Sequence, residues 1–247
     1  MQEIANDLWQ IEGPEVNFIG GVMFPTSSIV IRLPDRSLLV YSPVPFDDAA
    51  AAAIDAVGDV AHIVAPNRWH HLFAVAAARR WPGAAVYAAP GVAAKQPDLR
   101  IDHKLGEGAP WGDAIGVELV GGARKVNEVV LFHRASGTLV CADLVFHIAR
   151  PANWRTRLAL ALDGAGGGRL AQGRSWRLLR TDRAAARASA HHILEWPIAR
   201  VAPCHGTPIE IDAAAFAPHL TRLCGARIEA PPRDPRTDAT SAAVISR

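Results

Sequence analysis

The stretch APNRWHHLF, residues 65–73, decides how the fold of this sequence is interpreted. It begins at the end of the apolar run AHIVAP, residues 61–66, which predicts a buried strand. It leads into HLFAVAAARRWP, residues 71–82, which predicts a helix ended by Pro82. Two adjacent histidines stand at this junction. Three interpretations of the pair are open: the remnant of a metal site, a site of another kind, or ordinary structural residues.

Strand-like and helix-like runs lie on both sides of this stretch. Upstream, the sequence predicts a strand over residues 7–13, a hairpin of residues 27–33 and 37–43, and an alanine-rich helix over residues 45–58. Downstream, it predicts strands over residues 84–91, 115–122, 127–134 and 137–146, with an irregular segment over residues 98–114. The last two strands read as a hairpin whose turn contains Gly137.

The C-terminal third has a different composition. Residues 150–200 predict helices broken by the run GAGGG, and they carry ten arginines against three acidic residues. A strand and turn over residues 198–209 and a helix over residues 213–223 follow. The residues from 228 onward are rich in proline and polar side chains, which predicts a disordered tail. This order of elements suggests a two-layered sheet core flanked by helices.

Composition limits the class of protein. The 247 residues are 50% hydrophobic and 20% charged, which is ordinary for a soluble globular chain, and the net charge of +2 does not indicate nucleic acid. The N-terminus carries acidic residues and no apolar core, and no uncharged apolar run is long enough to span a bilayer. The three cysteines show no disulfide spacing. We therefore expect a cytoplasmic protein without nucleic-acid or membrane partners.

Three landmarks in this order resemble the metallo-β-lactamase fold: APNRWHHLF, GTLVCADLVF and VAPCHGTPI. They fall where that superfamily has its HxHxDH loop, its aspartate strand and its final HG histidine, and the resemblance covers residues 7–222. More narrowly, APNRWHHLF with NEVVLFHRASGTLVCADLVF resembles a side branch catalogued only as a domain of unknown function. The resemblance implies an α/β (α+β) fold, a four-layer αββα sandwich, over residues 1–227, with residues 228–247 as the disordered tail.

Three of the superfamily's metal ligands are absent. The two leading histidines of the motif fall on Pro66 and Arg68, and a further histidine expected before the strand EVVLF falls near Arg124. In the superfamily these three histidines bind the first of two metal ions. Because neither proline nor arginine binds a metal cation, the resemblance implies that this first site is lost.

The ligands of the second metal ion are retained as residues that can bind a cation. They fall on His70, His71, Asp143 and His205. Neutral imidazoles with one carboxylate suit one Zn²⁺ or Fe²⁺ ion. Because consecutive side chains point in different directions at the start of a helix, we favour His71, Asp143 and His205 as the minimal set. His71 and Asp143 are then the catalytic residues, and His70 is a fourth ligand or a supporting partner.

Arg68 and Arg124 suggest a role for the vacated first site. Their guanidinium groups would supply fixed positive charge, keep Asp143 ionised and bind a substrate carboxylate or phosphate. The same positive charge would also repel a metal ion nearby. The two arginines therefore favour binding of an anionic substrate but disfavour binding of a metal ion.

Other chemically capable residues have an ordinary structural interpretation beside a functional one. Cys141 shares a strand face with Asp143, and Cys204 adjoins His205, but small buried cysteines on strands are common. Asn127 and Glu128 either orient the site or cap a strand. We interpret four histidines as structural or solvated: His62, His133, His191 and His192.

The arginine-rich segment 150–187 has two interpretations. It is either a basic amphipathic surface for an anionic membrane or nucleic acid, or a solvated or interdomain face. We favour the second, because Trp154, Trp176 and several leucines alternate with the arginines, as in helices that pack over a sheet under snorkelling arginine stems.

The sequence therefore predicts a mononuclear metal-dependent hydrolase that acts on a small anionic molecule. The alternative is a catalytically inactive binding or scaffold protein that kept the fold and holds no metal. In that case the paired histidines cap the helix and Asp143 accepts hydrogen bonds from backbone amides. Neither the substrate nor the oligomeric state follows from the sequence.

Overall fold

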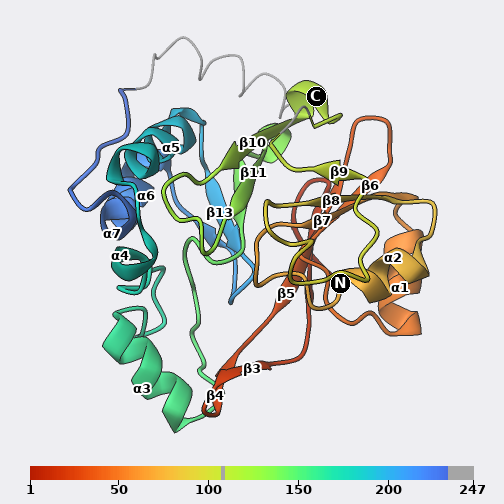
Figure 1. Cartoon of the computed structure of the whole chain (residues 1–247). Coiled ribbons are helices and arrows are strands. Elements are labelled where there is room, and N and C mark those ends of the chain that lie inside the picture. Colours follow the sequence, from red (N-terminus) through yellow and green to blue (C-terminus); the bar gives the residue numbers. More distant parts are fainter. Residues whose placement is uncertain (107–108, 233–247) are drawn as a thin grey trace.

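A computed structural model describes residues 1–106 and 109–232 of the chain. Two β-sheets pack face to face, and helices cover the outer face of each, as Figure 1 shows. The predicted four-layer αββα arrangement is therefore confirmed. No helix within the described ranges is both long and apolar enough to cross a membrane.

The first sheet has seven strands in the order β1-β2-β5-β6-β7-β8-β9. Its members are β1 (Gln2–Ala5), β2 (Leu8–Glu12), β5 (Ser27–Arg32), β6 (Leu38–Tyr41), β7 (Val60–Ala65), β8 (Ala85–Ala88) and β9 (His103–Lys104). The pairs from β1 to β6 are antiparallel, and those from β6 to β9 are parallel. Parallel neighbours need a crossover, and helices supply it between β6 and β8.

These crossover helices are α1 (Asp48–Asp55) and α2 (Ala74–Arg80). Helix α1 begins three residues after the predicted start at residue 45, because the Asp47 side chain caps it and accepts a hydrogen bond from the Ala50 backbone N–H at 2.7 Å. Helix α2 begins three residues later than predicted, since residues 71–73 form turns after the strand. It ends at Arg80, before Pro82, as expected.

The second sheet has five strands in the order β10-β11-β12-β13-β14. They are β10 (Ile115–Leu119), β11 (Val129–His133), β12 (Thr138–Cys141), β13 (Arg200–Pro203) and β14 (Ile209–Glu210). The predicted hairpin of β11 and β12 is confirmed, and Gly137 in its turn has a φ of 62°. Strand β12 also pairs with β13 in parallel, so both strands end at the same edge of the sheet.

Helices of the C-terminal part cover the outer face of this second sheet (Figure 1). They are α4 (Trp176–Leu179), α5 (Arg183–Glu195), α6 (Ala213–Phe216) and α7 (Thr221–Cys224), and the chain also has the short 3₁₀ helices η1 (Gly112–Ala114), η2 (Arg134–Ser136) and η3 (Ala217–Leu220).

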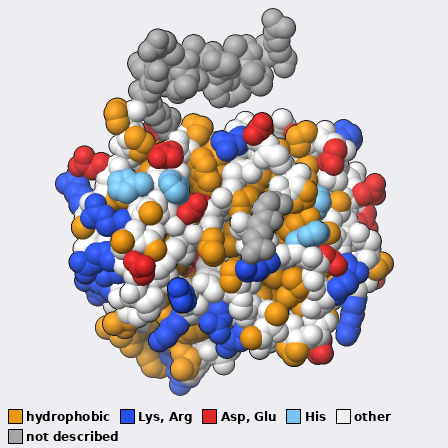
Figure 2. All heavy atoms as spheres, turned by 45° about the horizontal axis from the view of Figure 1, so that its top comes forward, with side chains coloured by type: hydrophobic (Ala, Val, Ile, Leu, Met, Phe, Trp, Pro, Cys, Tyr) orange, Lys and Arg blue, Asp and Glu red, His pale blue; other side chains and the backbone are white. Residues whose placement is uncertain are grey.

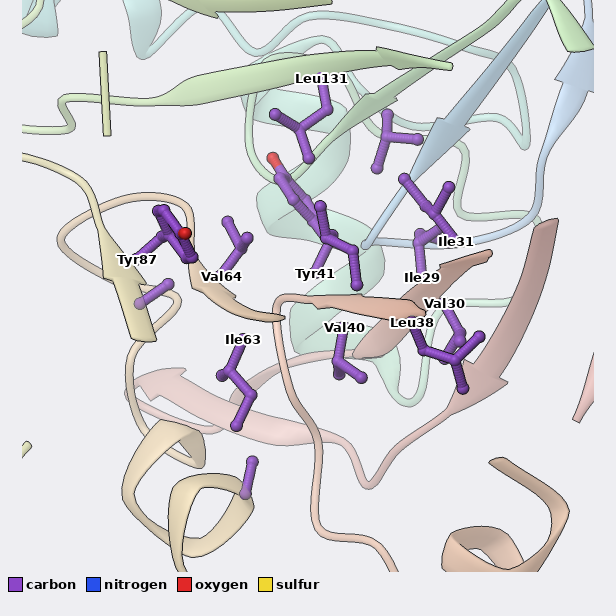
Figure 3. Close-up of a cluster of buried hydrophobic side chains, with 14 of the residues drawn as sticks. Ile29, Val30, Ile31, Leu38, Val40, Tyr41, Ile63, Val64, Tyr87 and Leu131 are labelled. Atoms are coloured by element: carbon purple, nitrogen blue, oxygen red, sulfur yellow. The ribbon is translucent and has the colours of Figure 1, made fainter. Parts of the chain in front are cut away.

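The main hydrophobic core lies between the two sheets. Figure 3 shows Ile29, Ile31 and Tyr41 of the first sheet near Leu131 of the second. All four side chains are fully buried, and the Tyr41 hydroxyl donates to the Val129 carbonyl at 2.9 Å. A buried phenol needs such a partner, and this bond links the two sheets across the core.

Besides the short strands β9 and β14 at the edges of the two sheets, two strand pairings have no counterpart in the sequence-based prediction. One is β1, at the edge of the first sheet. The other is a separate hairpin of β3 (Val16–Ile19) and β4 (Val22–Phe24), which rests against α3 (Trp154–Asp163). The predicted strand over residues 137–146 is also shorter, because β12 ends at Cys141.

The predicted tail begins at residue 228, and its residues 233–247 lie outside the described part of the chain. Ile228 is buried against the second sheet's helices, so packing extends at least one residue past the predicted boundary. The division into residues 1–227 and 228–247 stays a prediction.

Candidate metal centre

Three potential metal ligands meet at one end of the sandwich: His70, Asp143 and His205. Their candidate ligand atoms all lie within 4.8 Å of one another. The two Nε2 atoms are 3.0 Å apart, and each lies 3.3 Å from an Asp143 carboxylate oxygen. Each residue follows the C-terminal end of a strand, namely β7, β12 and β13. Both sheets therefore contribute to the cluster.

Hydrogen bonds on the far side of each imidazole orient the two rings. His205 Nδ1 lies 2.6 Å from the Pro25 carbonyl, which can only accept, so this nitrogen carries the proton. In the neutral ring, His205 Nε2 then presents a lone pair to the cluster. His70 Nδ1 lies 2.7 Å from the Ser42 hydroxyl, which can accept in the same way. Such outer partners hold metal-binding imidazoles in one tautomer.

Asn67 connects the histidine loop to the Asp143 carboxylate. Its Nδ2 donates to Asp143 Oδ2 at 2.7 Å, and its Oδ1 accepts from the Trp69 and His70 backbone N–H groups at 2.8 Å. Burial would raise the pKa of Asp143, but the adjacent His70 and His205 imidazoles outweigh it and hold the pKa well below its usual range. The carboxylate is therefore ionised and available to a cation.

Glu128 fixes the loop that carries Asp143. Its buried carboxylate accepts hydrogen bonds from the backbone N–H groups of Ala142, Asp143 and Leu144, at 2.8, 2.9 and 3.1 Å. These bonds turn the chain away from the sheet after Cys141, which explains why β12 is shorter than predicted. Burial, and then the Asp143 charge, raises the pKa of Glu128 to about 8. Of the two roles considered for Glu128, the structure supports orientation of the site.

His71 lies outside this cluster. It borders the adjacent cavity, and its Nδ1 is buried without a hydrogen-bond partner among the described residues. Burial, followed by the positive charge of Lys95, lowers the pKa of His71. The predicted minimal set contained His71 in place of His70. Because neighbouring side chains diverge in the turn over residues 70–73, only His70 reaches Asp143 and His205.

The two arginines predicted to bind an anion are separated. Arg68 borders the cavity, and its Nη1 donates to the Arg124 backbone carbonyl at 3.3 Å. The Arg124 side chain is exposed and is not part of the cavity wall. Lys95, which the sequence-based prediction did not include, is a second cation on the wall.

A cavity of about 620 Å³ opens directly beside the cluster. The hairpin of β3 and β4 forms one side of it, and α3 and α4 form another. Most of the lining side chains are apolar, and the Phe and Trp side chains among them are Phe18, Phe24, Trp69, Phe73 and Phe146. Pockets of this size and lining are typical of sites for small molecules.

Sequence reasoning missed two residues that support the cluster. Asn67 lies inside the quoted stretch, where an Asn just after a predicted strand is a signal for an Asx turn, in which its side chain binds the backbone of the next residues. Ser42 follows β6 and has a φ of 54°, which is uncommon for a residue other than glycine. Its position was not apparent because β6 and the histidine loop are distant in the sequence.

The other residues that the sequence analysis considered as functional candidates lie in environments typical of structural residues. Cys141 and Cys204 are free and buried, and burial raises the pKa of both thiols, so neither forms a thiolate readily. His191 and His192 are exposed on α5, as predicted. His133 is buried in β11, with Nδ1 2.7 Å from the Ser136 hydroxyl.

The fold has many counterparts among solved structures. A metallo-β-lactamase from Pontibacter korlensis is 15% identical with a TM-score of 0.58, and the match covers 91% of this chain and 96% of that one. An enzyme from Erythrobacter litoralis, solved with β-mercaptoethanol in its active site, is 14% identical with a TM-score of 0.60 over 91% and 93% of the chains. The enzyme FIM-1 from Pseudomonas aeruginosa in its mono-zinc form is 14% identical with a TM-score of 0.57 over 91% and 92%.

These identities establish the fold alone. A search of curated protein sequences finds no significant match. The sequence profile of the family described as domain of unknown function DUF4336 matches residues 5–159, which is more than half of the chain. The protein therefore belongs to the DUF4336 family, and it has the metallo-β-lactamase fold.

Proposed function

We propose that this protein is a hydrolase that uses one metal ion, Zn²⁺ or Fe²⁺, held by His70, Asp143 and His205. The observation that carries this proposal is the convergence of two imidazole Nε2 atoms and an ionised carboxylate, each held by a hydrogen bond to a residue outside the cluster. An ion bound by such a set supplies Lewis acidity and activates water near neutral pH. The chain's own residues supply the rest of the site.

A single ion is favoured over two. At the positions that the resemblance assigns to the first ion, this chain has Pro66, Arg68 and Arg124, which offer no lone pair to a cation. The Arg68 side chain also brings positive charge to the wall of the same cavity. Positive charge disfavours a second cation there and favours an anion.

The cavity favours a small substrate with an apolar body and an anionic group. The apolar walls would contact the apolar body of the substrate, and the Arg68 and Lys95 side chains would bind its anionic group. Arg68 Nε and His71 Nδ1 are both buried without a partner in the described residues. Unpaired buried polar atoms on a cavity wall are groups that a bound molecule can satisfy. We therefore assign Arg68 and His71 to substrate binding.

Metal content of the purified protein tests the proposal. We expect one Zn or Fe per chain by elemental mass spectrometry, lost in His70→Ala and in His205→Ala. His71→Ala is the matched control: it removes the neighbouring imidazole and should keep the metal. Loss of the metal in His71→Ala with retention in His70→Ala would contradict the ligand assignment.

The second candidate is a binding protein without metal or catalysis. It is favoured by one observation: the two Nε2 atoms lie 3.0 Å apart, so a single shared proton also satisfies the cluster. Thermal unfolding with added Zn²⁺ separates the candidates. A ligand that binds only the folded state raises the melting temperature, and an unchanged value in excess Zn²⁺ would support the second candidate.

A further inference from the structure

Exposed apolar side chains form a stripe along α3. Trp154, Leu158 and Leu162 are 61%, 50% and 68% exposed. They are spaced four residues apart, so they lie on one face of the helix. Single exposed leucines are ordinary, but a contiguous run of them on a helix marks an interaction surface.

Two neighbouring elements extend this stripe. At the start of α3, the Asn153 side chain donates to the Gly21 carbonyl at 3.1 Å, which brings the tip of the β3–β4 hairpin and Ile19, 69% exposed, to the stripe. At its end, the Ser175 backbone N–H donates to Asp163 at 2.7 Å, which brings in α4 and Leu178, 84% exposed. We call this surface the α3 patch: Ile19, Trp154, Leu158, Leu162 and Leu178.

Arginines surround the α3 patch with almost no opposing charge. Residues 150–180 contain seven arginines and one acidic residue, Asp163, which is held by Ser175. Arg155, Arg157 and Arg177 are exposed on the same two helices. In Figure 2, hydrophobic side chains with arginine or lysine beside them gather at the lower left edge, the side on which α3 lies in Figure 1.

We propose that the α3 patch binds the surface of an anionic lipid bilayer. Tryptophan and leucine would enter the boundary between headgroups and acyl chains, and the arginines would bind the lipid phosphate and carboxylate groups. This departs from the sequence-based expectation of a solvated or interdomain face for residues 150–187. The proposal rests on the exposure of the apolar side chains of the α3 patch, which cannot be read from the sequence.

The chemistry of the α3 patch argues against two other occupants. Single-stranded nucleic acid needs aromatic platforms for its bases, whereas four of the five patch side chains are aliphatic. A second copy packed across a two-fold axis would place the arginine rim against itself, with like charges opposed. An anionic bilayer matches both the apolar centre and the positive rim.

The α3 patch also adjoins the mouth of the cavity. Ile19 and Leu178 belong to both surfaces, and Phe18, which is exposed, lines the cavity next to Ile19. A bilayer bound at the patch would therefore face the cavity opening. An apolar molecule could pass between the two without crossing bulk water.

Sedimentation of the full chain with vesicles tests the proposal. We expect binding to vesicles of phosphatidylcholine mixed with phosphatidylserine, and little binding to phosphatidylcholine alone. Added salt should weaken the binding, because screening shortens the reach of the arginine charges. Equal binding to both vesicle types, or none to either, would overturn the proposal.

Variants distinguish the α3 patch from general charge attraction. Arg157→Gln with Arg177→Gln should weaken binding about fivefold for each arginine removed. The control, Arg79→Gln with Arg134→Gln, removes the same charge from α2 and η2 and should bind as the unaltered protein does. Leu158→Ser with Leu162→Ser should weaken binding at least about tenfold with unchanged circular dichroism.

Other outcomes identify a different occupant. Concentration-dependent dimerisation that the leucine variant abolishes would show that a second copy covers the α3 patch. Retention of a single-stranded oligonucleotide in place of vesicles would show a nucleic-acid surface. Either result overturns the proposal. Vesicle binding is measured without metal or substrate, so its failure is separate from failure of the proposed hydrolase function.

Discussion

At the scale of single residues, Asn67 holds two of the three ligand segments together. One amide group donates to Asp143 and accepts from the backbone at Trp69 and His70. Because the side chain is fully buried, no water replaces these bonds when it is removed. The position of the metal ligands therefore depends on a residue that does not itself bind the ion.

Replacement of Asn67 tests this dependence. We expect Asn67→Ala to lower the free energy of unfolding by about 2 kcal/mol, since it leaves buried polar groups unpaired. It should also weaken zinc binding in a calorimetric titration. Asn6→Ala, at an exposed residue of the turn between β1 and β2, is the matched control and should change neither quantity. Unchanged zinc affinity in Asn67→Ala would argue against a role in ligand positioning.

Glu128 gives a second test at this scale. Glu128→Gln preserves the shape of the side chain but replaces one acceptor oxygen with an N–H₂ group that faces backbone donors. We expect a loss of about 2 kcal/mol in urea unfolding, because the amide N–H₂ group leaves a buried backbone donor without its acceptor. Glu210→Gln, at an exposed residue of β14, should have little effect. A stability equal to that of the unaltered protein would contradict the proposed orienting role.

Histidine burial predicts how stability varies with pH. Burial lowers the pKa of His133, against a smaller raising effect of Asp7. The unfolded chain then binds a proton more readily than the folded one, so stability falls as pH drops below the unfolded pKa of about 6.5. We expect His133→Gln to show a shallower loss of stability between about pH 6.5 and 5 than the unaltered protein. An unchanged slope in His133→Gln would contradict this role of the His133 imidazole.

At the scale of elements, the strands whose side chains are buried could be predicted from the sequence, and the exposed β3–β4 hairpin could not. Strands β5, β6, β7 and β11 lie where the sequence predicts, because nearly all of their side chains enter the core. The β3–β4 hairpin has no buried side chain, so its residues show no core-facing alternation. Its place in the molecule depends on contact with α3, more than one hundred residues later.

The start of α1 gives a test at this scale. Asp47→Ala removes the side chain that caps the first turn, and should lower stability by about 1 kcal/mol. Asp48→Ala, one residue later, removes the same charge without removing a capping bond and should cost less. Thermal unfolding of both variants measures the difference. Equal losses of stability in the two variants would indicate that the interaction of negative charge with the helix dipole, and not the capping bond, stabilises the helix.

At the scale of the whole molecule, the candidate centre is assembled from three distant loops. The sequence supplied its residues, since His70, Asp143 and His205 stand at recognisable landmarks. The sequence-based analysis favoured His71 over His70, whereas the structure brings His70 to the cluster, because this choice depends on the turn that Asn67 imposes on residues 67–70. Nor did it predict the cavity, whose walls come from loops at the ends of both sheets, the hairpin and two helices.

The most direct test of the central claim is a crystal structure of the zinc-loaded protein with anomalous diffraction recorded at the zinc edge. The account predicts one anomalous peak per chain, between the Nε2 atoms of His70 and His205 and the Asp143 carboxylate. A peak on His71 without His70, a second peak beside Arg68, or no peak at saturating zinc would contradict it.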